Sequence, residues 1–325
     1  MSGPPAPDFI RYLAAKQPLD DRSLNRQVWG TLMQALQDRP NPAPLRVLEV
    51  GCGIGTMLER LLDWGLLTHA AYTGIDVEPE FIRTARQRCR RYAAEHQAGL
   101  LEDADGAMVL RRPGPEVRVT LTAADLFDFM DRQGGKSTWD LLVAHAVLDL
   151  IDLATALPRL LSLAADRGLF YFTLNFDGAT ILEPPIDPDL DHCIEALYHR
   201  TMDTRLCQGR PSGSSVTGRR LFRHLKEAGA RVAAAGSSDW VVFPGPEGYP
   251  GDEAYFLHFI IDTIGRALHG HPELDRGRLQ AWIAQRHRQI DAQELIYVAH
   301  QLDVMGYIEK EKVCTGPTPG ETAPI

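Results

Sequence analysis

Five short apolar runs alternate with segments of helical periodicity along the first half of the chain. The runs span 45–50, 71–77, 117–123, 139–146 and 168–175. The clearest helical segments between them lie at 56–67, 79–98 and 152–166. Nearly continuous apolar strands that alternate with amphipathic helices are typical of a parallel sheet covered on both faces. The pattern therefore predicts an α/β fold with a doubly wound, mostly parallel sheet.

The rest of the chain adds a leading helix, an insertion, a hairpin and further helices. Residues 177–216 hold several Pro, Asp and His residues, which predicts a loop-rich insertion with one helix near 190–203. Two strand-like runs separated by Gly-Ser-Ser within 230–243 predict an antiparallel hairpin that closes one side of the sheet. Helices are expected at 22–38, 218–228, 252–269, 275–289 and 291–305.

A glycine loop follows the first apolar run directly and carries Gly51, Gly53 and Gly55. Glycines at such a place permit a tight turn and let a ligand approach the backbone closely. Asp76 ends the second run, and Asp125 follows the third. A carboxylate at the first position can accept both hydroxyls of a ribose, and one at the second could accept an adenine amino group. Open α/β sheets bind ligands at this edge, where the strands end, so the sequence predicts a nucleoside-containing ligand there.

The loop does not have the full pattern of a dinucleotide site. Thr56 stands where a third glycine would complete GxGxxG, and Glu49 places a negative charge just before the loop. A nearby carboxylate suits a cationic ligand with an amino group better than a pyrophosphate. An NAD(P)-dependent oxidoreductase is nevertheless an alternative on this strand order.

Four motifs together resemble a known family. They are ExGxGxG at 49–55, GID at 74–76, AADLF at 123–127 and WDLLVAHAVLDLI at 139–151. Over roughly 45–243 they look like the successive motifs of class I S-adenosylmethionine-dependent methyltransferases, which have a Rossmann-like fold. The resemblance implies S-adenosyl-L-methionine as the cofactor and S-adenosyl-L-homocysteine as the product.

The resemblance also implies where the cofactor lies. Residues matching Gly51, Cys52, Gly53 and Gly55 pack against its methionine part, with Glu49 nearby. The residue matching Asp76 holds the ribose and the one matching Asp125 holds the adenine, and their neighbours Val77 and Leu126 join them at the cofactor. In several members a preceding helix closes over the cofactor, so Arg22 could pair with its carboxylate. A solvated charged face is the alternative for Arg22.

The resemblance divides the chain into four parts. Residues 1–44 would form a tail and a cofactor-covering helix, and 45–243 a methyltransferase core with the insertion 177–216. Residues 244–313 would form a C-terminal helical layer, and 314–325 a disordered tail, with the first eight residues frayed as well.

The candidate catalytic residues follow the fourth run. His145 would sit above the cofactor as a contact and general base, and Asp149 could orient it. A structural role for His145 is the alternative. The substrate pocket is expected to include Asn175 and Asp177 at the end of the fifth run.

Two histidines of the insertion complete the candidate pocket. His192 and His199 are about two helical turns apart, too far for one ion at ~2 Å from each ligand. No metal is therefore expected, and no two cysteines form a CxxC pair. His300 and Asp303 are expected to pair on one helix face, with no assigned role.

Charge and hydropathy limit the classes of partner that the sequence predicts. The chain has 34 Lys and Arg against 43 Asp and Glu, a net charge of −9, without a basic stripe. Nucleic acid is therefore not expected as a partner, and no apolar segment reaches the ~20 residues of a membrane helix. The expectation is a cytoplasmic enzyme that methylates a small molecule on O, N or C. A non-catalytic cofactor-binding or scaffold protein is the second alternative, and the oligomeric state is left open.

Overall fold

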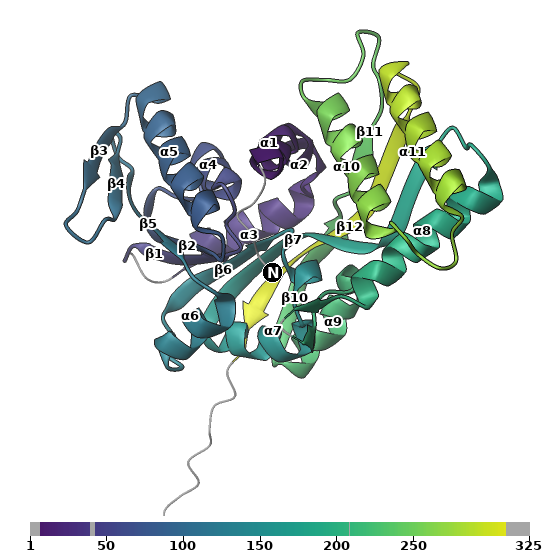
Figure 1. Cartoon of the computed structure of the whole chain (residues 1–325). Helices are drawn as coiled ribbons and strands as arrows, with labels where there is room; N and C mark the ends of the chain where they lie inside the picture. The colour runs from purple at the N-terminus through teal and green to yellow at the C-terminus, as the bar shows by residue number, and fades with distance from the viewer. Residues whose placement is uncertain (1–6, 40–42, 208, 310–325) are drawn as a thin grey trace, which may run out of the picture.

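Five parallel strands form the middle of the sheet in the computed structural model, which describes residues 7–39, 43–207 and 209–309. These strands are β1 (Leu45–Val50), β2 (His69–Asp76), β5 (Glu116–Ala123), β6 (Trp139–His145) and β7 (Ala164–Glu183). Their spatial order is β7-β6-β1-β2-β5, as Figure 1 shows. The strand order reverses at β1, and open sheets of this kind bind ligands at that switch point. The predicted mostly parallel α/β sheet is confirmed.

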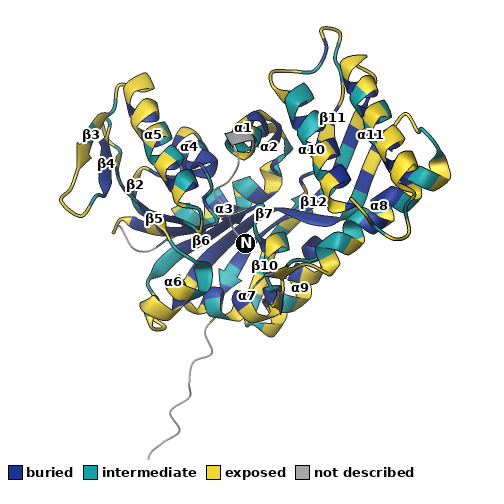
Figure 2. Ribbon diagram, viewed as in Figure 1, coloured by how far each residue is buried: buried dark blue, intermediate teal, exposed yellow. Residues whose placement is uncertain are grey.

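Helices cover both faces of the sheet. They are α3 (Arg26–Gln37), α4 (Thr56–Asp63) and α5 (Pro79–Glu95) on one side and α6 (Leu126–Gln133), α7 (Leu153–Ser162) and α9 (Thr217–Glu227) on the other. Strand β6 explains this arrangement, because successive side chains of a strand point to opposite faces. Leu141 and Val143 enter one core cluster, whereas Leu142 and Ala144 enter the other, and all four are fully buried. Figure 2 shows these buried strands between the more exposed helices.

A short antiparallel hairpin extends one edge of the sheet. It consists of β3 (Gly99–Glu102) and β4 (Met108–Arg111), and β4 pairs with β5. The sequence analysis did not predict this hairpin.

At the opposite edge of the sheet, two predictions from the sequence are wrong. Residues 291–305 do not form a helix, because β12 (Ile296–Ile308) runs antiparallel to β7 within the sheet. The runs within 230–243 do form strands, β10 (Ala230–Ser237) and β11 (Trp240–Val242), but they do not pair with each other as a hairpin. Each pairs with β12 instead. The expected helical layer 244–313 therefore contributes a strand to the sheet.

The residues of β12 account for the mistaken helix. Apolar Leu295, Val298, Leu302 and Met305 are spaced as on a helix face. The positions that point inward alternate instead, and they include the polar Gln301 and Asp303, both buried. Because two of the inward positions are polar, the alternation of a strand is not visible in the hydrophobic pattern of this segment.

The N-terminal segment contains three helices rather than the predicted helix over 22–38. They are α1 (Pro7–Ala15), α2 (Gln17–Ser23) and α3. Asn25 ends the α2–α3 link and caps α3, since its side chain accepts hydrogen bonds from the backbone N–H groups of Gln27 and Val28. Helix α1 begins inside the stretch expected to be frayed. The expected tail 314–325 lies outside the described residues.

Three more helices gather beside the extended ends of β7 and β12 (Figure 1). They are α8 (Pro188–Asp203), α10 (Glu253–Ala267) and α11 (Arg276–Asp291), which confirm the helices expected near 190–203, 252–269 and 275–289. The insertion also holds the short pair β8 (Leu206–Cys207) and β9 (Arg210–Pro211). Of the helices in the described ranges, none is long and apolar enough to cross a membrane.

Candidate functional site

The glycine loop after β1 adopts a backbone that only glycine adopts without strain. Gly51, Gly53 and Gly55 have φ values of +66°, +51° and +83°. A Cβ atom on Gly51 would lie 2.5 Å from the side chain of Val147, so the loop packs directly on the segment that follows β6. A side chain at Gly51 would therefore displace the loop that faces the cavity.

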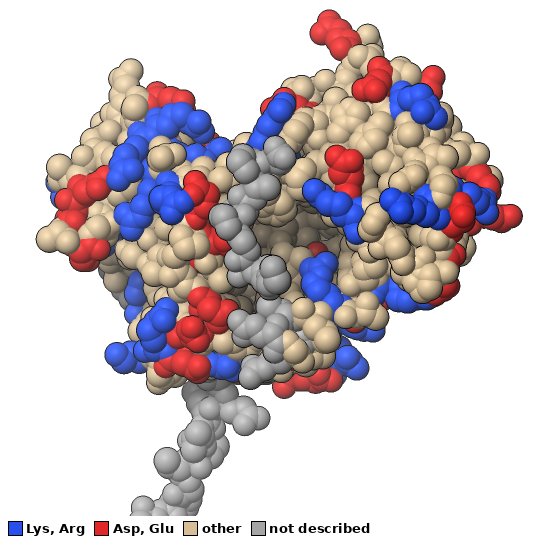
Figure 3. All heavy atoms as spheres, viewed as in Figure 1, with Lys and Arg blue, Asp and Glu red and all other residues tan. Residues whose placement is uncertain are grey.

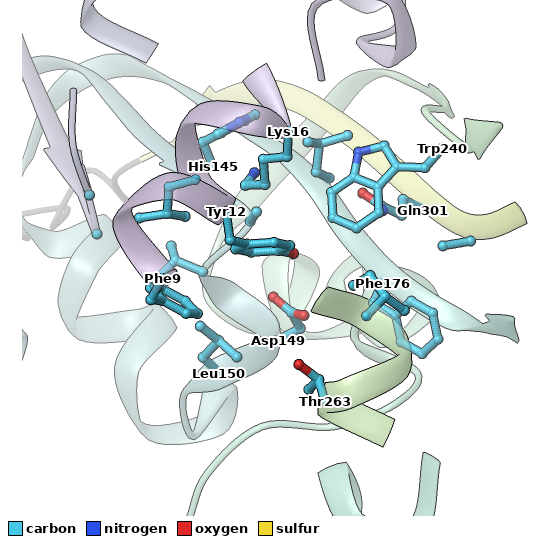
Figure 4. A pocket seen from close by; sticks show the side chains of 18 of the residues that line it. Phe9, Tyr12, Lys16, His145, Asp149, Leu150, Phe176, Trp240, Thr263 and Gln301 are labelled. Carbon is cyan, nitrogen blue, oxygen red and sulfur yellow. The ribbon is translucent and has the colours of Figure 1, made fainter. Parts of the chain in front are cut away.

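A cavity of about 480 Å³ lies where the parallel strands end. Its walls come from the glycine loop, from the ends of β2, β6 and β7, and from α1 and α10, which cover it (Figure 4). In the space-filling view of Figure 3 the surface is hollowed between the α5 and α10 sides, and acidic and basic side chains are interspersed on this face.

Asp76 lies at one end of the cavity and holds the glycine loop. Its Oδ2 accepts a hydrogen bond from the backbone N–H of Gly53 at 2.9 Å, and its Oδ1 accepts one from that of Glu78 at 3.0 Å. Each carboxylate oxygen has a further lone pair with which it can accept a hydrogen bond from a ligand hydroxyl. Burial raises the pKa of the Asp76 carboxyl above its usual value.

Glu49, the residue before the last of β1, lines the same end of the cavity. It is 1% exposed, and its Oε2 accepts a hydrogen bond from the Tyr72 hydroxyl at 2.5 Å. Burial raises the pKa of Glu49 to about 8. At neutral pH this carboxyl is therefore mostly protonated, unless a cation enters the cavity beside it.

A buried polar network ties the N-terminal helices to the sheet. The Lys16 Nζ donates to Asp20 Oδ2 at 2.6 Å, and the Trp240 indole N–H donates to Asp20 Oδ1 at 3.0 Å. Asp20 is fully buried. Burial alone would raise the pKa of Asp20, but Lys16, His145 and Arg60 together hold it well below its usual range.

His145 belongs to this network through both ring nitrogens. Its Nε2 lies 3.2 Å from Asp20 Oδ2 and its Nδ1 lies 2.8 Å from Thr173 Oγ1. Because a carboxylate can only accept, these contacts fit a neutral ring whose Nε2–H donates to Asp20 and whose Nδ1 accepts from Thr173. Burial is the largest cause that lowers the pKa of His145, to about 4. The ring lines the cavity, but its nitrogens are both occupied.

Asp149 differs from His145, because one of its side-chain polar atoms has no partner in the described part of the chain. It lies in a short 3₁₀ helix, Leu148–Leu150, and lines the cavity, into which its carboxylate projects together with the Tyr12 ring (Figure 4). Its Oδ1 is buried and has no hydrogen-bond partner within the described residues. Burial raises the pKa of Asp149 to about 6.

Five of the expected cofactor residues do not line the cavity: Arg22, Gly55, Val77, Asp125 and Leu126. Arg22 forms a two-pronged ion pair with Glu253 and also donates to the Val241 carbonyl. Asp125 caps α6, accepting from the backbone N–H groups of Phe127 at 2.8 Å and Asp128 at 3.1 Å. Leu126 packs against the core cluster under α6 and α7.

Val77 also lies outside the cavity wall, next to Asp76. Its side chain is 60% exposed. Cys52 does line the cavity, and its thiol is buried.

The four residues expected to line the substrate pocket also point elsewhere. The Asn175 amide donates to the Leu302 carbonyl at 2.8 Å, and Asp177 pairs with Arg219. His192 is exposed on α8. His199 lies behind the wall, where its Nε2 is 3.0 Å from the hydroxyl of the lining residue Thr180.

His300 and Asp303 lie on β12 rather than on a helix, and each bonds to other parts of the fold. His300 Nδ1 is 2.8 Å from Asp239 Oδ1. Asp303 is fully buried and accepts from the backbone N–H groups of Leu174 and Asn25, both at 2.8 Å. Asp303 therefore joins β7, β12 and the start of α3.

Several cavity residues were not predicted from the sequence. The charged or amide side chains among them are Lys16, Arg205, Arg266 and Gln301, and the aromatic ones are Phe9, Tyr12, Phe81, Phe176, Tyr198, Trp240, Phe259 and Tyr297. A partial signal was present in α1, where Phe9 and Tyr12 are three positions apart and therefore share a helix face. The sequence contained no such signal for Trp240 and Gln301, because their positions at the cavity depend on how β11 and β12 pair.

Comparisons with known proteins find the domain and the fold. Residues 47–133 match the family model of a methyltransferase domain. No curated protein matches the chain. An S-adenosylmethionine-dependent methyltransferase from Thiobacillus denitrificans, in complex with S-adenosylhomocysteine, is 14% identical, with 86% of this chain and 92% of that chain covered and a TM-score of 0.40.

Two further solved structures are similar at the same level. A phosphoethanolamine N-methyltransferase from Haemonchus contortus, in complex with phosphomonomethylethanolamine and S-adenosylhomocysteine, is 10% identical over 87% of this chain and 53% of that chain, with a TM-score of 0.41. A mycolic acid cyclopropane synthase is 11% identical over 85% and 83%, with a TM-score of 0.42. Residues 47–133 thus form a methyltransferase domain within this chain.

Proposed function

We propose that this protein transfers the methyl group of S-adenosylmethionine to a small-molecule acceptor that binds beside Asp149. The observation that carries the proposal is that one covered cavity contains the glycine loop and Asp76 as well as Asp149, whose Oδ1 has no partner among the described residues. A cytoplasmic location and the lack of a nucleic-acid partner are parts of the same proposal.

The residues at the loop end fit the cofactor. Asp76 would accept the ribose hydroxyls with the lone pairs that its two backbone bonds leave over. Glu49 would receive the amino group and Lys16, 6% exposed, the carboxylate of the methionine part. The exposed side chain of Val77 would be covered by the adenine ring. When bound, the cofactor supplies a methyl group activated on a sulfonium.

The remaining cavity residues orient the acceptor and exclude water. Tyr12 of α1 stacks on Phe259 of α10 with ring centroids 4.3 Å apart, so the two helices meet over the cavity. Such a cover keeps water away from the reacting atoms and holds them in line. Asp149 can accept a hydrogen bond from the acceptor at neutral pH, because its pKa of about 6 leaves it mostly ionised.

Calorimetry with S-adenosylmethionine, S-adenosylhomocysteine and NAD on one protein sample tests the proposal. We expect S-adenosylhomocysteine to bind and the Asp76→Ala variant to bind it at least about tenfold more weakly, the scale of a charge-assisted hydrogen bond. Asp140→Ala is the matched control, because Asp140 pairs with Arg46 at the opposite end of the strands. Binding of NAD without S-adenosylhomocysteine would contradict the proposal.

A further inference from the structure

The Tyr12 ring lies beside the Asp149 carboxylate (Figure 4), and further aromatic side chains line the same cavity. They include Phe176, Tyr198, Trp240, Phe259 and Tyr297. Aromatic faces carry negative electrostatic potential and attract cations, most strongly where water is excluded. This wall therefore favours a ligand that combines an apolar body with a positively charged or strongly polarised group.

Two buried acceptor atoms in this wall have no partner. Oδ1 of Asp149 and Oε1 of Gln301 accept no hydrogen bond from any described residue. A buried polar atom without a partner costs free energy, which a ligand that supplies hydrogen-bond donors recovers. The ligand that fits this wall is therefore one that donates hydrogen bonds.

Lys16 and Arg205 attract the charge of Asp149 through space, without direct contact. Lys16 itself pairs with Asp20 at 2.6 Å, and Arg205 and Arg266 line the cavity from exposed positions. Arg266 lies over the Phe259 ring at 5.3 Å. Among the described residues, Asp149 takes part in no salt bridge. A carboxylate ligand placed beside Asp149 would meet a buried charge that no direct ion pair with a described residue compensates, and would be repelled.

We propose that the methyl acceptor is an amine with an apolar or aromatic body, whose nitrogen binds between the Asp149 carboxylate and the surrounding aromatic rings. The inference rests on the proposed function, since it names the substrate class of the same site. An amine supplies N–H donors for the unpartnered oxygens and, when protonated, a cation for the rings. An alcohol or phenol supplies one donor and no charge.

The same placement suits the transfer itself. An amine that binds protonated first gives its extra proton to Asp149, which passes it to water. The lone pair of the neutral nitrogen then forms the new N–C bond while the C–S bond breaks and leaves its electron pair on sulfur. The nitrogen thereby takes over the positive charge that sulfur loses. Asp149 stabilises that charge and then accepts the surplus N–H proton, which passes to water. No other co-reactant is needed.

Binding to the protein saturated with S-adenosylhomocysteine tests the inference. The probes are three matched sets, each an amine, the alcohol and the carboxylic acid on the same body: benzyl, 2-phenylethyl and 2-(naphthyl)ethyl. We expect at least one amine to bind at least about tenfold more tightly than its alcohol, and the acids to bind least. In Asp149→Asn the preference for that amine should fall by about tenfold or more, while its alcohol and S-adenosylhomocysteine bind as before.

The outcomes separate this inference from the proposed function. Failure of S-adenosylhomocysteine itself to bind overturns the proposed function. If S-adenosylhomocysteine binds but an alcohol or an acid exceeds its amine in every set, or no amine binds, the acceptor is not an amine. An amine preference that persists in Asp149→Asn also overturns the inference, because Asp149 would then not hold the nitrogen. Unchanged S-adenosylhomocysteine binding shows that the variant is folded.

Discussion

His145 and Asp149 lie close together in sequence but differ in what their side chains can do. Both nitrogens of His145 are engaged by Asp20 and Thr173, and its pKa is about 4. Asp149 keeps an unpartnered oxygen and has a pKa of about 6. The group that can exchange a proton with a bound acceptor near neutral pH is therefore Asp149. In this proposal His145 positions the N-terminal helices.

The first prediction distinguishes the two residues by pH. The affinity of an amine for the S-adenosylhomocysteine complex should fall as pH drops through about 6, since protonation removes the charge of Asp149. The fall should approach tenfold per pH unit and should vanish in Asp149→Asn. His145→Asn should keep it. Calorimetric titrations between pH 5 and 8 measure this, and a pH dependence lost in His145→Asn alone would reverse the assignment.

The second prediction concerns Glu49 and the cofactor. At pH 7 a carboxyl with a pKa of about 8 is roughly nine-tenths protonated. An amino group bound beside it favours the ionised form, so S-adenosylhomocysteine binding should release close to one proton. Calorimetry in two buffers of different ionisation enthalpy gives the number released. Glu49→Gln keeps an acceptor for the Tyr72 hydroxyl and should release none; equal release in both proteins would show that another group is responsible.

At the scale of the elements, β12 shows where sequence reasoning worked and where it did not. The run 139–146 identified a strand because its residues are apolar on both faces, Leu141 and Leu142 alike. Strand β12 instead buries polar residues such as Asp303, whose carboxylate is satisfied by backbone N–H groups from distant segments. Hydrophobic periodicity contains no information about such partners. The glycine loop and Asp76 were found because their spacing is local.

The third prediction tests β12 as a strand. A Cβ atom on Gly306 would lie 2.0 Å from the Arg231 carbonyl oxygen of β10, so Gly306→Ala should lower the free energy of unfolding by about 2 kcal/mol. In a helix the same change would raise it. Gly30→Ala in α3 is the control, because its Cβ would have no atom within 4 Å, and it should stabilise by about 0.5–1 kcal/mol. Urea unfolding measures both, and stabilisation by Gly306→Ala would argue against the strand.

For the molecule as a whole, the cover of the cavity comes from segments that lie far apart in the chain. Helix α1 and helix α10 meet through the stacked rings of Tyr12 and Phe259. Trp240 reaches Asp20 across 220 positions of sequence. Such contacts arise only when the sheet has brought the segments together. For that reason the residues of the cover, including Lys16, could not be predicted from the sequence.

The buried ionisable groups of this assembly determine how stability depends on pH. Burial raises the pKa of Glu49 to about 8 and of Asp149 and Asp303 to about 6, so the folded state binds extra protons up to those values. Their stabilisation is complete at low pH and is lost as pH rises through about 6 and then 8. The pKa values of Asp20 and His145 are lowered, so their contribution is lost in acid instead.

The fourth prediction is therefore that the free protein loses about 2–4 kcal/mol of stability between pH 5.5 and pH 8.5. Repulsion within a chain of net charge −9 acts in the same direction. Glu49→Gln removes the most strongly shifted carboxyl and should make the alkaline fall shallower. S-adenosylhomocysteine should stabilise more at pH 8.5 than at pH 5.5, because its amino group compensates the ionised Glu49. Urea unfolding at both pH values, with and without the ligand, measures these changes. Two outcomes would show that Glu49 is not protonated at the cofactor site of the free protein. One is a free protein that is more stable at pH 8.5 than at pH 5.5, and the other is a Glu49→Gln variant whose stability falls with pH as steeply as that of the parent.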